Sequence, residues 1–394
     1  MTKRTRAPGA AFGGPADDPG GSPDFPTWPA LEEADMEAVA AVLRTNQLSM
    51  LSSPEVEAFE NEFAGYHRVK HCIAVNSGTS AIHLALIALG VAAGDHVAVP
   101  AHTFVASATP ACYTGAAPLL VDIDHESFCM SPADLAAKIT PKTRAVIAVH
   151  LNGMPADLDA ILQVAADRGV PVVEDAAQAV GARLDGKPVG GFGAVACFSF
   201  WEDKTLTMGG EGGALVTDDD ELAARIRRLR HHGHGPLTDA LSACLEVGYN
   251  YRPTAMQAAL GRSQLRRLDT YLERRRANAV GLRARLDGLP GLHLPADSDR
   301  RRSGWWKFVV RLDDSARLTT EELIHRLRSR GVPALPRYPV PLSRQPGLVP
   351  LLAQPPDCPV AEAISTNLVS LPIHPALTER HLALMAYAVT EELG

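Results

Sequence analysis

The stretch RAVIAVHLNGMPADLDAILQVAADRGVPVVEDA, residues 144–176, contains two kinds of pattern. Its ends, 144–151 and 170–176, are short runs that are almost continuously apolar, whereas 157–169 has the apolar spacing of a helix. A strand that is apolar along its whole length is covered on both faces. Alternation of such strands with helices is typical of a largely parallel sheet with helices on both sides. This stretch therefore predicts an α/β fold.

The same alternation extends in both directions from this stretch. Further strands are expected at 72–75, 96–100, 117–123, 195–200 and 213–217, and helices at 79–90, 103–111 and 134–139. The last two strands lie close together in the sequence, with a glycine-rich loop between them. We expect these segments to form one large domain around a mostly parallel sheet.

The length of 394 residues is too great for one ordinary core and predicts two domains. Residues 1–27 are rich in glycine and proline and are interpreted as a flexible leader. The large domain is expected at 28–255, with helices at 31–45, 54–66 and 219–230. Residues 256–394 are expected to form a linking helix and a smaller C-terminal α+β domain. Its expected elements are one long helix over 254–286, a strand at 305–312, a helix at 320–331 and a last helix from Thr378.

Composition and charge exclude several classes of protein. The apolar fraction of 46% is normal for a globular chain, and no apolar run is long enough to span a membrane. No apolar stretch follows the basic N-terminus, so a secretory signal is not expected and the chain is predicted to be cytoplasmic. The net charge of −7 argues against a general nucleic-acid binder. The arginine-rich residues 225–230 are interpreted as a solvated helix face, and the six cysteines as reduced and mostly buried.

The motif NSGTSAIHLAL, residues 76–86, marks the turn from a strand into a helix. Free backbone N–H groups at such a helix start favour an anion, most often phosphate. Gly78 allows close approach of the backbone, and the hydroxyl of Thr79 or Ser80 can donate further hydrogen bonds. An ordinary helix cap explains the same residues equally well.

Two further motifs carry ionisable groups. In VVEDAAQAVGA, Asp175 ends an apolar strand, and Gln178 lies one helical turn further on. A carboxylate at a strand end can hold a ring nitrogen protonated, which makes pyridoxal phosphate (PLP) an electron sink. In FSFWEDKTLTMGGEGGALVT, Lys204 lies between a strand containing Ser199 and a glycine-rich loop, as suits a Schiff-base lysine. Taken singly, Asp175 could be a helix cap and Lys204 an exposed lysine.

With these motifs, the chain resembles the DegT–DnrJ–StrS family of sugar aminotransferases over about residues 28–392. The resemblance rests on seven motifs in the family's order: SGTSAIHLAL (77–86), VPAHTFVASA (99–108), VVEDAAQAVGA (172–182), FSFWEDK (198–204), GGEGGALVT (209–217), GYNYRPTAMQAALG (248–261) and SLPIHPALT (370–378). It implies the type I fold of PLP-dependent transferases, with a large domain of mostly parallel sheet and a small α+β domain.

The resemblance also implies roles for single residues. Lys204 matches the lysine that forms the Schiff base, and Asp175 matches the acid at the pyridine nitrogen. The other implied cofactor-binding residues are Gly78, Thr79 and Ser199 at the phosphate, Phe104 and Gln178 at the two ring faces, and Asn250 at the phosphate of the neighbouring subunit. The last residue implies a homodimer with shared active sites.

The implied reaction moves an amino group from glutamate or glutamine to a keto-sugar nucleotide or a keto-cyclitol, in the biosynthesis of a secondary metabolite or a glycan precursor. Freed Lys204 would act as the general base. Two alternatives stay open: a PLP enzyme that catalyses elimination, cyclisation or carbon–carbon bond formation, and a non-catalytic PLP-binding regulator. The presence of Lys204 weighs against the family's dehydratase branch, in which the lysine is replaced.

Some positions differ from the commoner family pattern or lie near the expected substrate. Asn152 stands where an aromatic residue is expected, and Trp201 is less usual before the lysine. Arg337 and Tyr338 belong to a loop that, by resemblance, borders the entrance of the site; a plain proline-rich turn is the competing interpretation. These four residues are the candidate substrate contacts. The histidines at 231, 232 and 234 lack suitably spaced further ligands, so no metal site is expected.

Overall fold

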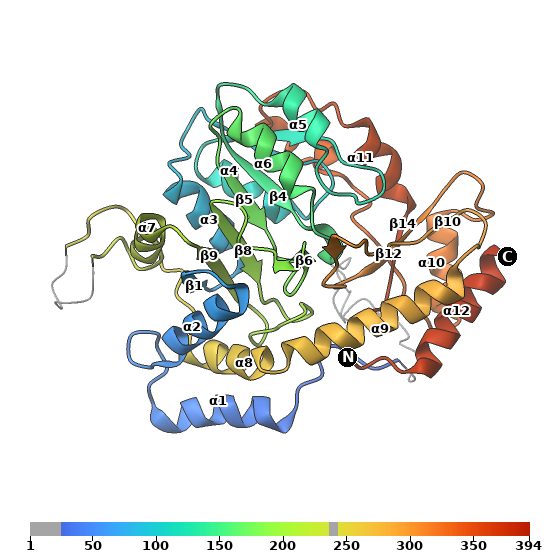
Figure 1. Cartoon of the computed structure of the whole chain (residues 1–394), viewed down its shortest axis with the longest axis horizontal. Coiled ribbons are helices and arrows are strands. Elements are labelled where there is room, and N and C mark those ends of the chain that lie inside the picture. The colour runs from blue at the N-terminus through green and yellow to red at the C-terminus, as the bar shows by residue number, and fades with distance from the viewer. Residues whose placement is uncertain (1–24, 236–242) are drawn as a thin grey trace, which may run out of the picture.

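The computed structural model describes residues 25–235 and 243–394. The predicted leader lies outside the described residues except for positions 25–27, and Phe25 already packs against the core of the C-terminal body. Figure 1 shows a large body built on a sheet and a smaller C-terminal body, joined by the long helix α9 (Leu268–Leu286). The predicted α/β class is confirmed.

The large body contains a seven-stranded sheet in the order β1-β9-β8-β5-β4-β2-β3. The pairs from β8 through β5, β4 and β2 to β3 are parallel, and β9 runs antiparallel to both β1 and β8. The strands are β1 (His71–Val75), β2 (His96–Pro100), β3 (Ala117–Val121), β4 (Thr143–Val149), β5 (Val172–Asp175), β8 (Val195–Ser199) and β9 (Gly213–Thr217). The sheet is thus mostly parallel, as predicted.

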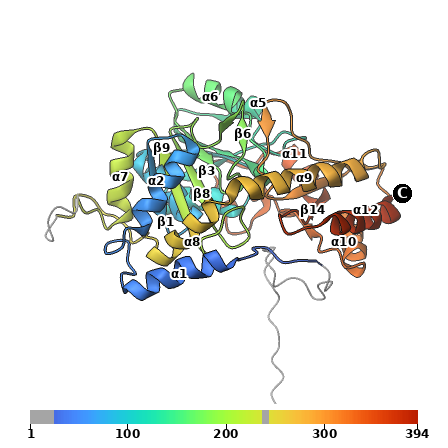
Figure 2. The same ribbon diagram turned by 60° about the horizontal axis from the view of Figure 1, so that its bottom comes forward.

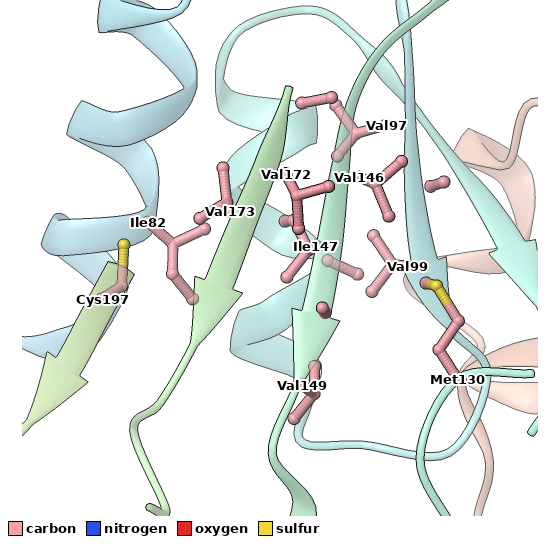
Figure 3. Packing of buried hydrophobic residues seen from close by; sticks show 14 of the residues in the cluster. Ile82, Val97, Val99, Met130, Val146, Ile147, Val149, Val172, Val173 and Cys197 are labelled. Carbon is pink, nitrogen blue, oxygen red and sulfur yellow. The ribbon is translucent and has the colours of Figure 1, made fainter. Parts of the chain in front are cut away.

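Apolar layers cover both faces of this sheet because alternate residues of a strand point to opposite sides. In β1, Ile73 and Val75 belong to one buried cluster, whereas Cys72 and Ala74 belong to another. Figure 3 shows part of the first cluster, in which Ile82 of helix α3 (Gly78–Ala88) lies beside Val173 of β5, and Val146 of β4 lies beside Val99 of β2. The helices around the sheet are α1 (Glu33–Thr45), α2 (Glu55–His67), α3, α4 (Thr109–Tyr113), α5 (Pro132–Lys138), α6 (Leu158–Ala166), α7 (Asp220–Arg230) and α8 (Ala255–Leu265).

The C-terminal body is an antiparallel sheet packed against helices. Its strands are ordered β10 (Leu292–His293), β12 (Phe308–Leu312), β14 (Leu368–Leu371) and β13 (Leu335–Pro336). Its own apolar core includes residues of α9, α10 (Thr320–Ser329) and α12 (Glu379–Leu393), and α12 lies along α9 in Figures 1 and 2. A third, small sheet contains β6 (Arg183–Leu184), β7 (Lys187–Pro188) and β11 (Arg301–Arg302), and α11 (Pro359–Ile364) is a further short helix. Within the described residues, no helix has the length and apolar character needed to cross a membrane.

The prediction of a single long helix over 254–286 is wrong, because the helix is interrupted at Arg266 and Arg267, between α8 and α9. No glycine or proline marks the break in the sequence. Helix α8 packs against α1 and α2 of the large body, whereas α9 packs against α12 of the small one. Arg267 pairs with Asp35 of α1 at 2.5 Å. The break therefore comes from tertiary packing, which redirects the helix from one body to the other.

Two local predictions also need correction. The segment 103–111 is not one helix but a 3₁₀ turn (Val105–Ser107) followed by the short α4. The arginine-rich end of α7 is not simply a solvated face: Arg230 is buried, pairs with Glu60 at 2.5 Å and donates to the Ala74 carbonyl at 2.8 Å. A buried guanidinium needs such partners, and here they tie α7 to α2 and β1.

Candidate active site

A pocket of about 670 Å³ opens beside the ends of β1, β5 and β8. In an open α/β sheet, ligands collect at the carboxyl ends of the strands. Residues of the small body, from Trp306 and from the loop around Arg337, form its remaining wall. The sheet thus supplies the floor of the pocket. The second body supplies a wall that the alternation of strands and helices alone did not predict.

One end of the pocket is a cradle at the start of α3. Ser77 caps the helix by accepting a hydrogen bond from the Ser80 amide, while the preceding N–H groups of the first turn lack intrahelical partners. A Cβ atom at Gly78 would lie 2.8 Å from the Cβ of Ser199, so glycine allows these two residues to lie close together. Gly78, Thr79 and Ser199 all line the pocket. Together, these backbone and hydroxyl donors can hold a phosphate.

Asp175 lies on the floor of the pocket at the end of β5. It accepts hydrogen bonds from the Ser107 hydroxyl at 2.7 Å and the Ala177 amide at 3.1 Å. Burial raises the pKa of this carboxyl, against the lowering effect of its hydrogen bonds and of Lys204. A protonated ring nitrogen would supply the positive charge that favours the carboxylate.

The neighbouring Glu174 faces the other way because side chains alternate along a strand. It is fully buried and accepts hydrogen bonds from the amides of Gly190, Phe192 and Gly193. Of the two consecutive acids, one therefore belongs to the pocket and the other holds a loop in place.

Lys204 lies in the turn after β8 and is almost completely buried. Its amine lies 3.5 Å from the centre of the Trp306 ring, and its carbonyl accepts a hydrogen bond from Trp28 Nε1 at 3.0 Å. Burial lowers the pKa of this amine to about 7, assisted by Arg337 and opposed by Asp203. A lysine with this pKa has a substantial neutral, nucleophilic fraction near neutral pH.

Asp203 holds the wall of the small body against the lysine turn. Its carboxylate accepts hydrogen bonds from Lys307 Nζ at 2.7 Å and from Trp306 Nε1 at 3.2 Å. Burial opposes ionisation, yet Lys307 and Lys204 lower the pKa of Asp203 below its ordinary value. Trp306 and Lys307 were missed in the sequence, where residues 305–312 were interpreted as a strand. The strand begins only at Phe308, and the two residues before it turn into the pocket.

A polar network forms a second part of the wall. Arg337 donates to the side-chain oxygens of Asn152 at 2.7 Å and of Gln178 at 2.9 Å. The Gln178 side-chain oxygen also accepts a hydrogen bond from the backbone N–H of Asn152. Its side-chain nitrogen donates one to the Tyr338 hydroxyl at 3.2 Å. The Phe104 and Tyr338 rings lie 6.2 Å apart at the pocket. The structure therefore brings together five of the sequence-predicted site residues.

Two of the candidate residues, Asn152 and Asn250, do not themselves line this pocket. Asn152 is buried behind Arg337, with a left-handed backbone (φ 59°) that asparagine tolerates better than an aromatic residue would. Asn250 is exposed and is bridged to His231 by backbone pairing, outside the lining of the pocket. Trp201 does line it.

All six cysteines are free, and four are buried, while Cys112 is half-buried and Cys244 is exposed. In the described part of the chain, no group of three or more His, Cys, Asp or Glu side chains is arranged to hold a metal ion.

The arrangement of the pocket fits PLP in three respects. The cradle of Gly78, Thr79 and Ser199 suits the phosphate, the buried Asp175 suits the pyridine nitrogen, and the Lys204 amine suits the aldehyde carbon. The comparisons with known proteins agree with this fit. A sequence model described as the DegT/DnrJ/EryC1/StrS aminotransferase family matches residues 29–390.

This chain belongs to that family.

Individual relatives match over most of their length. A dTDP-3-amino-3,4,6-trideoxy-alpha-D-glucose transaminase of Streptomyces venezuelae is 40% identical over 364 residues, which cover 92% of this chain and 93% of the relative. A GDP-perosamine synthase of Caulobacter vibrioides is 38% identical over 93% of this chain and 97% of its own. The solved structure of S. venezuelae DesV superposes with a TM-score of 0.85 at 39% identity, covering 91% and 93% of the two chains. The chain is thus a PLP-dependent aminotransferase of fold type I.

Proposed function

We propose that this aminotransferase moves an amino group from glutamate or glutamine to the ketone of a nucleotide-linked sugar. The observation that carries the proposal is the buried Lys204, whose pKa is lowered to about 7, in one pocket with Asp175 and the Gly78 cradle. The relatives named as a dTDP-sugar transaminase and a GDP-perosamine synthase support a nucleotide-linked acceptor.

We assign the binding of the cofactor to residues at both ends of the pocket. Gly78, Thr79 and Ser199 would hold its phosphate, and Phe104 and Gln178 would lie against its ring. When bound, PLP supplies the electron sink that makes removal of a proton from the donor's α-carbon feasible.

Two residues of the chain carry the chemistry in this proposal. Asp175 is held by Ser107 and would keep the ring nitrogen of the cofactor protonated. Lys204 would hold the cofactor through its amine, and this amine, once free, would take the α-proton of the donor and later return a proton to the acceptor carbon. Its burial supports this role, since a neutral amine is needed to accept the proton. Trp201 and Tyr338, which line the pocket, would contact the substrates.

We further propose that two copies of the chain form a homodimer with shared active sites. Asn250 is exposed outside its own pocket, as expected of a residue that reaches the phosphate in the partner subunit. Large apolar side chains are exposed before, on and after α1, which supports a protein contact there: Leu31, Met36, Leu43, Leu48 and Leu51. Sedimentation of the purified protein tests the dimer, and a monomer with full activity would contradict it.

The reaction is tested by adding dTDP- and GDP-linked keto-sugars, separately, to enzyme already converted by an amino donor. The proposal expects return of the PLP absorbance and formation of an aminosugar nucleotide with at least one of them. If donors react but every such ketone fails, the acceptor assignment is wrong. A donor that yields an elimination, cyclisation or condensation product instead would support the alternative chemistry, and PLP binding without turnover would support a regulator.

A further inference from the structure

Arg337 is a buried cation without an acidic partner in contact. Only 8% of its surface is exposed, yet its guanidinium donates hydrogen bonds to neutral amide oxygens, those of Asn152 and Gln178. Within the described residues, no carboxylate lies within ion-pair distance of it. Burial lowers the pKa of the guanidinium, which shows the cost of holding its charge there. A buried charge normally has a charged partner, so the missing anion is a feature to be explained.

The nearest acids are engaged elsewhere. Asp203 is paired with Lys307 at 2.7 Å, and Asp175 accepts from Ser107 and a backbone amide. A third acid of the pocket wall, Glu211, is solvent-exposed. The acids of the pocket therefore leave the charge of Arg337 without a contacting counter-ion.

Hydrogen bonds and ring contacts fix the position of the guanidinium, and they leave its Nη1 edge without an acidic partner in the part of the chain that the structure describes. Asn152 fixes its Nε and Gln178 fixes one terminal nitrogen, while the rings of Tyr338 and Trp306 lie 4.0 Å and 4.6 Å from its central carbon. Among the described residues, no acidic side chain pairs with the other terminal nitrogen, Nη1, although the Tyr338 side chain lies close enough to raise the pKa of the guanidinium. This clamp orients the Nη1 edge of a planar fork, the geometry that matches a carboxylate.

The guanidinium lies near the reacting amine, because both groups lie beside the Trp306 ring. Lys204 Nζ is 3.5 Å from the centre of the Trp306 ring, and the Arg337 central carbon is 4.6 Å from the same point. The two groups are thus no further apart than the sum of those distances. An amino acid whose nitrogen takes the place of Lys204 Nζ carries its carboxylates within that reach.

We propose that Arg337 binds a carboxylate of the amino donor, with Asn152 as the positioning residue that holds its guanidinium. The inference rests on the proposed aminotransferase function and adds a ligand group to it. Either the α-carboxylate, common to all amino acids, or the side-chain carboxylate of glutamate offers the required chemistry, and the donors used in the test distinguish them.

The test compares holoenzyme carrying Arg337→Met with the wild type by following the loss of PLP absorbance in single half-reactions. The apparent Kd for L-glutamate is expected to rise about 30-fold or more, with a smaller change in the rate at saturation. For Arg337→Lys, which keeps the positive charge but lacks the planar guanidinium, the apparent Kd is expected to lie between those of the wild type and Arg337→Met. An equal loss for L-glutamine identifies the α-carboxylate, and a loss for L-glutamate alone identifies the side chain.

The matched control is Arg344→Met, seven residues further along. Arg344 is 65% exposed and pairs with Glu362, so its loss should change neither Kd. Unchanged donor affinity in Arg337→Met or Arg337→Lys that binds PLP normally would overturn the inference. Should the wild type react with no amino acid, the proposed function fails. In that case, calorimetric titration with glutarate tests the carboxylate site without turnover. Binding to the wild type that is lost in the Arg337 variants supports the site, and equal binding to all the proteins, or binding to none, refutes it.

Discussion

Replacement of Lys204 by methionine should stabilise the PLP-free protein. The amine is buried, with its pKa lowered from the ordinary 10.5 to about 7, so below pH 7 the folded chain must hold a charge that water would solvate better. At about 1.4 kcal/mol per pH unit, this difference corresponds to about 5 kcal/mol. The lost contact with the Trp306 ring offsets about 1–2 kcal/mol. A net gain of about 3 kcal/mol in the free energy of unfolding is expected.

The gain should depend on pH with a defined sign. Between pH 7 and pH 10.5 the unfolded lysine binds a proton that the folded one has lost, so this group makes the wild type more stable as pH rises. Lys204→Met lacks the effect. Its advantage should be largest at and below pH 7 and should vanish towards pH 10.5. Urea unfolding of both PLP-free proteins at pH 6.5, 8.5 and 9.5, at one protein concentration, measures it.

The control for this measurement is Lys142→Met, because Lys142 is exposed and its removal should leave stability almost unchanged. Equal or lower stability of Lys204→Met at pH 6.5, or an advantage that does not change with pH, would refute the claim that burial depresses the pKa of Lys204.

Three further predictions concern the neighbours of Lys204. Asp175→Asn should retain PLP but slow the donor half-reaction at least about 100-fold in stopped-flow absorbance; a near-normal rate would mean that another group holds the ring nitrogen. Gly78→Ala should weaken PLP binding at least tenfold in a fluorescence titration, because its Cβ would lie 2.8 Å from that of Ser199; unchanged affinity would remove the cradle from the phosphate. Lys307→Met leaves Asp203 unpaired and should raise the pKa of the catalytic amine, moving the acidic limb of the half-reaction's pH profile upward; an unmoved limb would contradict this coupling.

The sequence predicted those parts of the structure that depend on local pattern. Continuously apolar strands alternating with helices are sufficient to indicate the mostly parallel sheet, and two of its parallel strands end at Asp175 and Ser199. The position of Lys204 in a turn before a glycine-rich loop was equally visible. These features concern residues close in sequence, or residues brought together by the regular geometry of a parallel sheet.

The remaining features depend on contacts between distant segments. Trp306 and Lys307 reach Asp203 across more than 100 residues, from a loop whose shape no local pattern sets. The pairing of Arg337 with Asn152 is of the same kind. It gives a physical reason for an asparagine where an aromatic residue was expected: a left-handed backbone and a side-chain oxygen for the guanidinium. The break between α8 and α9 likewise follows from packing on two bodies.

The most direct test of the account is the visible absorbance spectrum of the purified protein with PLP, recorded before and after addition of L-glutamate or L-glutamine. We expect a yellow band that depends on Lys204 and that bleaches to the pyridoxamine form with at least one of the two donors. A band that ignores both amino acids, or one that persists unchanged in Lys204→Met, would contradict the assignment of this chain as an aminotransferase that works through Lys204.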